Sequence, residues 1–478
     1  MVNISTALLA LSTLAGCAYA VNPVVIKGKE FVDTKTNNRV QIIGVDYQPG
    51  GQAAYNPEVK ADALSNGTVC LRDAALLQML GVNTIRVYNV NPDANHDDCA
   101  SIFNTAGIYM ILDVNSPDAS INRAAPWTSY TLDYLTRIFG VVEAFKNYPN
   151  TMAFFSANEV MNDVETGNIN PPYIRAVQRD LRAYIAKQSS RTIPVGYSAA
   201  DVREILQDTW NYLQCGGNST LTDSSSEMFG LNSYSWCGAD ATYTSSGYDQ
   251  LVAMFSNTSI PVFFSEYGCN KPSGVPRVFN EVQALYGTQM TGLSGGLVYE
   301  YSEEASDYGL VVINDNGTVT LRADYNNLQG QYNKLDVKLL ENSAATDSQT
   351  TPPTCDPSLI TTSNFSTTWV LPDQPSGAAD LINNGIPNPN QGKIVDVTNL
   401  DVSIPVYNAN GVRLGGIKVT ARSDANTPSG TNTSANTATG TDSSGTASPS
   451  ATKKAAAVRV GANLLSVVVL VVAAVAVL

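Results

Sequence analysis

The stretch CLRDAALLQMLGVNTIRV, Cys70–Val87, places a helix directly before a strand, and this unit decides the fold. Apolar residues recur at helical spacing over Cys70–Leu80, with charges on the other face, whereas Val82–Val87 is a short, mostly β-branched run. Similar pairs fill residues 24–340, where Ile174–Lys187 is a second amphipathic helix. This alternation is typical of an α/β protein with parallel strands.

Eight runs have the length and composition of buried strands. They are Val40–Tyr47, Val82–Val87, Ile108–Val114, Met152–Ala157, Ile193–Ser198, Met228–Ser233, Pro261–Ser265 and Gly296–Glu300. Eight parallel strands separated by helices predict a closed (β/α)8 TIM barrel. Active sites of this fold lie at the C-terminal ends of the strands, so the polar residues that follow the runs are expected to share one cleft.

Two glutamates stand at the ends of such runs. Asn158 and Glu159 directly follow Met152–Ala157, and Glu266 directly follows Pro261–Ser265. The tips of the fourth and seventh strands lie across the mouth of a barrel from each other, and two facing carboxylates are what glycoside hydrolysis requires. A single strand-end glutamate is more often a surface or ion-paired residue, but two at matching positions predict Glu159 as general acid/base and Glu266 as nucleophile. A separation of ~5–5.5 Å would give a retaining reaction.

Polar neighbours are expected to support this pair. We expect Arg86 to keep Glu266 ionised, Tyr234 to donate its hydroxyl to the same carboxylate, and Asn158 to bond a sugar hydroxyl. Other carboxylates compete for the catalytic roles: Asp46, Asp113, Asp118, Glu300, Glu303 and Glu304. Asp118 and Glu300 are the strongest of these, and we interpret them as substrate-contacting or structural.

Aromatic residues recur at the predicted rim of the cleft, where sugar rings stack on them. They are Tyr47, Tyr88, Tyr234, Trp236, Tyr299, Tyr301 and Tyr308. Simple packing is the alternative for each. Tyr299 and Tyr301 alternate within one strand-like run, so one of the two is expected to face the core.

Both ends of the chain carry processing signals. An apolar run ends in the small-x-small pattern Ala18-Tyr19-Ala20, which predicts a cleaved signal peptide. The apolar tail Leu464–Leu478 is shorter than a membrane-spanning helix and predicts replacement by a GPI anchor, with an ordinary tail anchor as the alternative. The expected organisation is a signal peptide (1–20), a catalytic barrel (21–345), a linker and small β appendage (346–422), a disordered Ser/Thr-rich stalk (423–452) and a GPI signal tail (453–478). Asn410-Gly411 predicts a hairpin turn in the appendage.

Cysteine, charge and histidine content narrow the function further. Six cysteines remain after Cys17 leaves with the signal peptide, which fits three disulfides in an oxidising compartment with 15 possible pairings. Acidic residues exceed basic ones by 42 − 28 = 14, which argues against a nucleic-acid partner. His96 is the only histidine and no CxxC spacing occurs, so neither a metal nor a cofactor is expected.

Seven motifs carry a family resemblance: GVDYQPGG from Gly44, RVYNVNP from Arg86, SPDASINR from Ser116, SANEV from Ser156, NSYSWCG from Asn232, FFSEYGCN from Phe263 and VYEYSEEASDYGLV from Val298. Through them the sequence resembles the fungal β-1,3-glucanosyltransferases of glycoside hydrolase family 72, the Gas/Gel/Phr type, over about residues 21–355. The resemblance implies a retaining enzyme that cleaves a β-1,3-glucan internally and transfers the new reducing end to the non-reducing end of another glucan.

The resemblance also implies roles for individual residues. It makes Glu159 the acid/base and Glu266 the nucleophile. The glucan-contacting positions that it implies are Tyr88, Asp118, Asn158, Tyr234, Tyr299 and Tyr301. The disulfides that it implies are Cys70–Cys99, Cys215–Cys355 and Cys237–Cys269. No cysteine follows Cys355, so the chain looks like the shorter subfamily that lacks a cysteine-rich carbohydrate-binding module.

The expected partners are β-1,3-glucan donor and acceptor chains and, through the anchor, the outer face of the plasma membrane or the cell wall. Two alternatives remain. An endo-β-glucanase would release the same covalent intermediate to water, and a wall mannoprotein would bind glucan without cleaving it. The two glutamates disfavour the binding protein, whereas the preference for transfer over hydrolysis rests on the resemblance.

Overall fold

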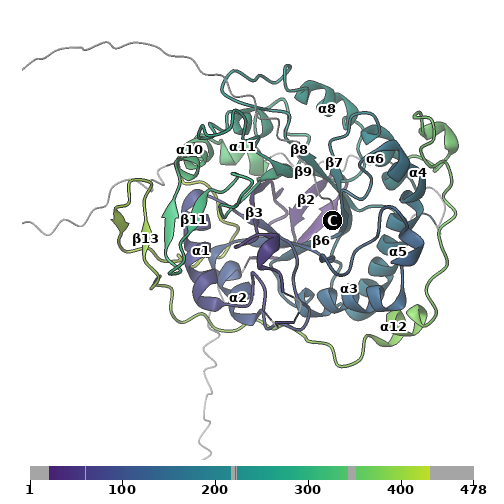
Figure 1. Cartoon of the computed structure of the whole chain (residues 1–478), viewed down its shortest axis with the longest axis horizontal. Coiled ribbons are helices and arrows are strands. Elements are labelled where there is room, and N and C mark those ends of the chain that lie inside the picture. Colours follow the sequence, from purple (N-terminus) through teal and green to yellow (C-terminus); the bar gives the residue numbers. More distant parts are fainter. Residues whose placement is uncertain are drawn as a thin grey trace, which may run out of the picture. The chain divides into compact units, whose positions relative to one another are not determined.

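Eight parallel strands close into a barrel in the computed structural model, which describes residues 21–56, 58–59, 61–216, 221, 223–342 and 351–430 (Figure 1). Each strand pairs with the next along the chain, and the last pairs with the first. The barrel strands are β3 (Ile42–Tyr47), β4 (Thr84–Val87), β5 (Tyr109–Asp113), β6 (Thr151–Asn158), β7 (Val195–Ala200), β8 (Met228–Ser233), β9 (Val262–Tyr267) and β10 (Gly295–Val298). Each overlaps one predicted run, so the predicted (β/α)8 barrel is confirmed.

Helices surround the barrel and connect its strands (Figure 1). They are α1 (Gly67–Leu80), α2 (Asp97–Ala106), α3 (Leu132–Phe145), α4 (Val164–Ile169), α5 (Pro171–Gln188), α6 (Leu206–Gln214), α8 (Tyr248–Met254), α9 (Glu281–Leu285), α10 (Ala323–Tyr332), α11 (Val337–Asn342) and α12 (Ala378–Asn384), with 3-10 turns at Gln52–Ala54, Pro126–Thr128 and Pro357–Leu359.

Hydrogen bonds and a glycine determine where α1 begins and ends. The Asn66 side chain accepts from the amides of Thr68 and Val69, and Gly81 ends the helix with a φ of 94°.

A hairpin closes the N-terminal end of the barrel. It consists of β1 (Val24–Lys27) and β2 (Glu30–Asp33), which pair antiparallel. The Phe31 ring meets the Phe263 ring edge to face at 5.9 Å, within a buried apolar cluster that hairpin and strands share. This end is filled by side chains, so a site is expected at the opposite, C-terminal end of the strands.

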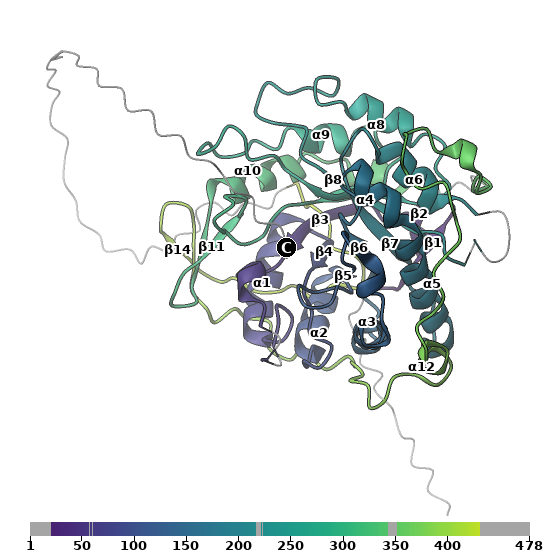
Figure 2. The ribbon, with the colours of Figure 1, turned by 45° about the vertical axis from the view of Figure 1, so that its right-hand side comes forward.

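Residues 351–430, called the strap here, run around the outside of the helices (Figures 1 and 2). Trp369 stacks on Tyr212 of α6 with ring centroids 4.9 Å apart, and α12 packs against α5 and α3. Near the end of the strap, Thr420 exchanges two hydrogen bonds with Gln78 of α1, at 2.7 and 2.8 Å. The strap therefore belongs to the same compact unit as the barrel.

The predicted hairpin at Asn410-Gly411 lies within the strap. Its strands, β13 (Val406–Tyr407) and β14 (Arg413–Leu414), extend the antiparallel pair β11 (Val311–Ile313) and β12 (Val319–Leu321) into a four-stranded sheet. Gly411 has a φ of 75°, which a glycine adopts without strain. The β appendage is thus joined to strands that directly follow the barrel.

Ordered structure continues past Ser423, where the sequence predicts the start of a disordered stalk. Asn426 is fully buried, and its amide donates to the carbonyls of Gln78 and Val82 at 3.1 and 2.9 Å. A polar side chain docks here because it satisfies carbonyls at the end of α1. The predicted signal peptide, residues 431–452 of the stalk and the tail lie outside the described residues.

Three disulfides join the pairs that the family resemblance implies: Cys70–Cys99, Cys215–Cys355 and Cys237–Cys269. The Cys215–Cys355 bond spans 140 residues and attaches the start of the strap to the end of α6. The amide of Gly216 also donates to the Pro353 carbonyl at 2.8 Å. Within the described residues, no helix has both the length and the apolar character needed to cross a membrane.

Candidate active site

The C-terminal ends of β4, β6, β7, β8 and β9 bring a set of polar side chains together. Glu266 of β9 lies opposite Asn232 of β8 in the strand register, and Asn158 of β6 lies opposite Ser198 of β7. Glu159 directly follows β6. The two glutamates predicted from the sequence are therefore attached to the same end of the barrel.

Glu266 is held on both carboxylate oxygens. Its Oε1 accepts from Arg86 Nη1 at 3.1 Å and from the Tyr88 hydroxyl at 2.9 Å, and its Oε2 accepts from the Tyr234 hydroxyl at 2.7 Å. Burial raises the pKa of Glu266, while Arg86 and the two hydroxyls favour its ionised form. The carboxylate is thus fixed in position by three donors.

Arg86 is fully buried and links several of these groups. Its guanidinium pairs with Asp113 through two contacts of 2.9 and 3.1 Å and donates to Asn158 Oδ1 at 3.0 Å. It also lies over the rings of Tyr88 and Phe155, at 4.4 and 4.7 Å. Burial alone would lower the pKa of Arg86, but the charge of Asp113 leads the influences that raise it well above its usual value. A permanent positive charge therefore lies beside Glu266.

Glu159 lies in a different environment. It is partly exposed, and its Oε1 accepts one hydrogen bond, from Asn232 Nδ2 at 2.9 Å. Its backbone φ of 50° falls in the left-handed region, which is uncommon for a residue with a side chain. The Glu159 amide donates to the Ser198 carbonyl at 2.9 Å, which anchors this turn at the strand end. Strained backbone of this kind clusters at functional sites.

Asn158 has a fixed orientation. Its Oδ1 accepts from Arg86 Nη2 at 3.0 Å, from the Ser198 hydroxyl at 2.8 Å and from Asn232 Nδ2 at 3.0 Å. Three donors surround this position, and an NH2 group could not accept from them, so the oxygen of the Asn158 amide must lie there. The residue is exposed, so its NH2 group is available to a ligand in the cleft.

An aromatic wall, defined by Tyr234, Tyr299 and Tyr308, stands beside Glu266. The three rings meet edge to face, with centroids 5.3 to 6.3 Å apart. All three are partly exposed. The wall offers ring faces next to the carboxylate that Tyr234 contacts.

Other aromatic residues predicted at the rim lie in the interior. Tyr47 and Tyr301 are fully buried, and their hydroxyls donate to Asp73 of α1 at 2.9 and 2.5 Å. Trp236 is buried against Tyr248. Of the alternating pair, Tyr301 therefore faces the core and Tyr299 the rim, so Tyr301 is not placed to touch a ligand in the cleft.

Asp118 does not join the glutamates. It is exposed, in a turn closed by backbone hydrogen bonds between Ser116 and Ala119, and no hydrogen bond joins it to Glu159 or Glu266 in the described part of the chain. The predicted role of Asp118 therefore requires a ligand that extends to this turn.

The other competing carboxylates have structural surroundings. Asp113 pairs with Arg86, and Glu303 pairs with Arg322. Burial and the nearby Glu304 raise the pKa of Glu300 to about 8. Asp46 is fully buried, and neither of its oxygens has normal hydrogen-bond geometry to a described donor. Burial, followed by the charge of Glu266, raises the pKa of Asp46 well above its usual value.

Asn232, Ser198 and Ser265 are the residues of this network that sequence reasoning missed. Asn232 joins Asn158 to Glu159, and both serine hydroxyls contact its Oδ1. A sequence signal was available, because Asn232 and Tyr234 stand two positions apart at a strand end and such residues share a face. The motif NSYSWCG therefore carries two site residues.

The single histidine has a structural role. His96 is buried, and its Nε2 lies 2.8 Å from Asp62 Oδ2. Among the described residues, no group of three or more His, Cys, Asp or Glu side chains is arranged to hold a metal ion.

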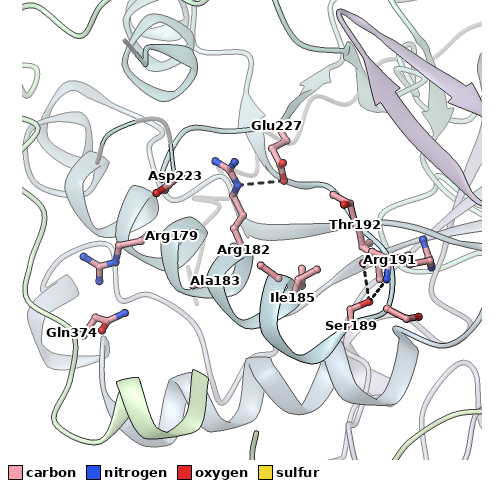
Figure 3. A pocket seen from close by; sticks show the side chains of 13 residues that line it. Arg179, Arg182, Ala183, Ile185, Ser189, Arg191, Thr192, Asp223, Glu227 and Gln374 are labelled. Atoms are coloured by element: carbon pink, nitrogen blue, oxygen red, sulfur yellow. Dashed lines mark hydrogen bonds and ion pairs between the residues drawn. The ribbon is translucent and has the colours of Figure 1, made fainter. Parts of the chain in front are cut away.

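A hollow of about 750 Å³ lies at the opposite end of the barrel, over α5 and the residues that lead into β7 and β8 (Figure 3). Its lining side chains include Arg179, Arg191 and Gln374, and Arg182 pairs with Glu227 at 3.5 Å. The residues that line it include no aromatic ring on which a sugar could stack. The chemistry expected of a glycosidase site is found at the other end.

Comparisons with known proteins agree with this site. A family model described as glucanosyltransferase matches residues 13–336. The chain is 54% identical to 1,3-beta-glucanosyltransferase gel2 of Aspergillus fumigatus, over 89% of the chain and 88% of that protein. It is 46% identical to the probable 1,3-beta-glucanosyltransferase GAS3 of Saccharomyces cerevisiae, over 82% and 78%. A solved structure of Saccharomyces cerevisiae Gas2p in complex with laminaripentaose matches with a TM-score of 0.67 and 35% identity, over 75% of this chain and 78% of that one.

Proposed function

The chain belongs to the glucanosyltransferases of glycoside hydrolase family 72, and we propose that it cleaves and rejoins β-1,3-glucan with Glu266 as nucleophile and Glu159 as general acid/base. The observation that supports these roles best is the contrast between the two carboxylates. Three donors hold Glu266, one of them a permanent cation, whereas Glu159 is partly exposed and has one neutral donor. A retaining reaction needs these two environments, because the nucleophile acts ionised and the acid acts protonated.

In the first step Glu266 attacks the anomeric carbon of a glucan unit. Glu159 gives its proton to the glycosidic oxygen, and the fragment on the reducing side leaves. The new bond joins the sugar to a Glu266 oxygen and neutralises that carboxylate. Arg86 and the tyrosine hydroxyls fix the direction of attack, because they hold both oxygens before the substrate arrives.

In the second step Glu159, now ionised, takes a proton from a hydroxyl at the non-reducing end of another glucan. That oxygen attacks the anomeric carbon and releases Glu266, so the β configuration is kept and the acceptor chain becomes longer. The same intermediate passed to water would give hydrolysis. The relatives named 1,3-beta-glucanosyltransferases support the first outcome.

Several residues are proposed to contact the glucan. The NH2 group of Asn158 faces the cleft and is suited to bond a hydroxyl next to the scissile linkage. Tyr88 and the aromatic wall offer rings and hydroxyls beside the same sugar, and Asp118 would contact a more distant unit. Tyr301 is excluded from this set because it is buried against Asp73.

The enzyme is proposed to act outside the cell, held to the membrane or wall by a GPI anchor that replaces residues 453–478. Three disulfides support an oxidising compartment. Release of the protein from intact cells by a phosphatidylinositol-specific phospholipase C tests the anchor.

Incubation with a laminari-oligosaccharide whose reducing end has been reduced tests transfer. We expect products longer than the starting chain together with shorter ones, because the intermediate passes to another oligosaccharide. Chromatography with mass spectrometry measures both classes. Products that are all shorter than the substrate would show an endo-β-glucanase, and an unchanged substrate would show a glucan-binding protein.

A further inference from the structure

Among the residues that the structure describes, Asn232 is the one buried side chain whose hydrogen bonds reach both members of the Asn158-Glu159 pair. It is 3% exposed, its Nδ2 donates to Glu159 Oε1 at 2.9 Å, and the same nitrogen donates to Asn158 Oδ1 at 3.0 Å. An amide nitrogen has two hydrogens, so these two bonds use both. Asn232 has no donor left for a ligand and acts on its two neighbours.

The orientation of the Asn232 amide is set by its surroundings. Asn158 Oδ1 is an acceptor, and an ionised Glu159 is acceptor-only, so the nitrogen must face them. On the other side, Oδ1 of Asn232 accepts from Ser265 Oγ at 2.8 Å. Ser198 Oγ lies 3.1 Å from the same oxygen and gives its single hydrogen to Asn158 Oδ1 at 2.8 Å. Both serines are fully buried. The nitrogen and the oxygen of the Asn232 amide therefore both have hydrogen-bond partners, and these partners fix its orientation.

We propose that Asn232 is the positioning residue of the acid/base, and that it occupies Oε1 of Glu159 so that Oε2 is the oxygen that transfers the proton. This inference rests on the proposed function of Glu159. A carboxylic acid carries its proton on one oxygen, and an oxygen that already accepts from Nδ2 is the poorer place for it. The bond ties Oε1 to β8, the strand on which Asn232 is the register partner of Glu266 in β9.

The Nδ2 bond has a second consequence for the reaction. A neutral donor stabilises a carboxylate more than a carboxylic acid, so it favours the ionised form that activates the acceptor in the second step. The donor is uncharged, and the acid form that the first step needs is therefore not eliminated. Asn232 would thus serve both steps without moving.

The test compares two substrates in the full-length mature enzyme. A laminari-oligosaccharide needs a proton on its leaving oxygen, whereas a dinitrophenyl β-laminari-oligosaccharide has a leaving group that departs without one. For Asn232→Ala we expect kcat/KM to fall about 10- to 100-fold on the oligosaccharide, as expected for a displaced catalytic group, and less than about 3-fold on the aryl substrate.

Asn232→Asp gives a distinct signature at the same position. The introduced carboxyl cannot donate when ionised, and its negative charge repels Glu159 Oε1 and displaces that side chain, so the loss on the oligosaccharide at neutral pH should exceed that of Asn232→Ala. At acidic pH the introduced carboxyl is protonated and donates again, so activity relative to wild type should recover. A packing role alone predicts no such pH-dependent recovery.

Ser265→Ala keeps the test decisive if Asn232→Ala does not fold. It removes the 2.8 Å bond to Asn232 Oδ1 and leaves Nδ2 intact, so the same dependence on leaving group should appear with a smaller amplitude. Ser224→Ala is the matched control, because Ser224 is fully buried but bonds to Arg175, away from the site. We expect wild-type kinetics on both substrates for this variant.

Equal losses on the two substrates in Asn232→Ala would overturn the positioning role. If Asn232→Ala does not fold, the same conclusion follows from a Ser265→Ala enzyme whose kcat/KM falls equally on the oligosaccharide and the aryl substrate. Failure of the proposed function looks different, because Glu159→Gln would then retain glucan cleavage. The two ideas therefore fail separately.

Discussion

Glu266 lies within β9 and accepts hydrogen bonds from three side chains, whereas Glu159 follows the end of β6 and accepts from one. The first carboxylate is buried and the second is partly exposed. A nucleophile has to keep one charge state and one direction, so dense contacts suit it. An acid/base has to change its protonation within each cycle, and a less crowded group does this at lower cost. The three donors to Glu266 thus suit a nucleophile, and the one donor to Glu159 suits an acid/base.

Glu266→Ala should produce the largest effect. No other carboxylate in the described part of the chain is held in the cleft as Glu266 is, so glucan cleavage is expected to fall by more than about 10⁴-fold. Added azide would enter the space left by the side chain, attack the anomeric carbon directly and give an α-glycosyl azide from an activated substrate. Thin-layer chromatography and NMR of the product measure this, and a β-configured azide would contradict the role of Glu266.

Glu159→Ala should produce a smaller and more selective loss. General acid and base catalysis contributes about 10²–10⁴-fold, so cleavage of the oligosaccharide should fall by that factor. An activated aryl glycoside should still form the covalent intermediate, and azide should release it as the β-glycosyl azide. An α-glycosyl azide from Glu159→Ala would contradict the assignment of different roles to Glu159 and Glu266.

The difference between the two glutamates was visible in the sequence only in part. Eight strand runs predicted the barrel, and strand ends predicted both glutamates, because periodicity and strand order decide which side chains share a cleft. Asn232 was missed because the spacing from Tyr234 indicates only that both face the cleft, whereas the contact of Asn232 with Glu159 joins two strands and depends on the fold. Tyr301 was placed at the rim because alternation alone does not tell which of two faces is the inner one. Only the bond to Asp73 decides it.

Composition also did not predict how residues 423–430 pack. Ser423 begins a polar segment with too few apolar residues for a core, and such segments are predicted to be disordered. Asn426 is nevertheless buried, because its side-chain amide donates to the carbonyls of Gln78 and Val82 at the end of α1. Docking of this kind depends on where distant carbonyls lie.

Two further aspartates sharpen the comparison, because both lie on the Glu266 side but differ in their contacts. Asp113 accepts two bonds from Arg86, whereas Asp46 is fully buried without normal hydrogen bonds to its oxygens. Asp113→Asn should lower the free energy of unfolding by about 3 kcal/mol, because it removes the anion beside a buried cation. It should also lower kcat, since Arg86 positions Glu266. Urea unfolding and glucan kinetics measure the two effects.

Asp46→Asn should be the mild counterpart, changing the free energy of unfolding by less than about 1 kcal/mol at pH values below the ordinary aspartate pKa of about 3.9. Burial raises the pKa of Asp46, and at such pH values the carboxyl is neutral in both the folded and the unfolded chain, so an amide replaces it with similar shape and the same charge. A carboxyl with a raised pKa in the folded state gives stability that is complete below its unfolded pKa and is lost as pH rises through the folded value. Asp46→Asn should therefore gain stability relative to wild type as the pH rises from the unfolded pKa through the folded value. A variant that instead loses stability relative to wild type over this range would show that the fold favours the ionised form of Asp46, and that the contacts on this side of the cleft hold three carboxylates, those of Glu266, Asp113 and Asp46.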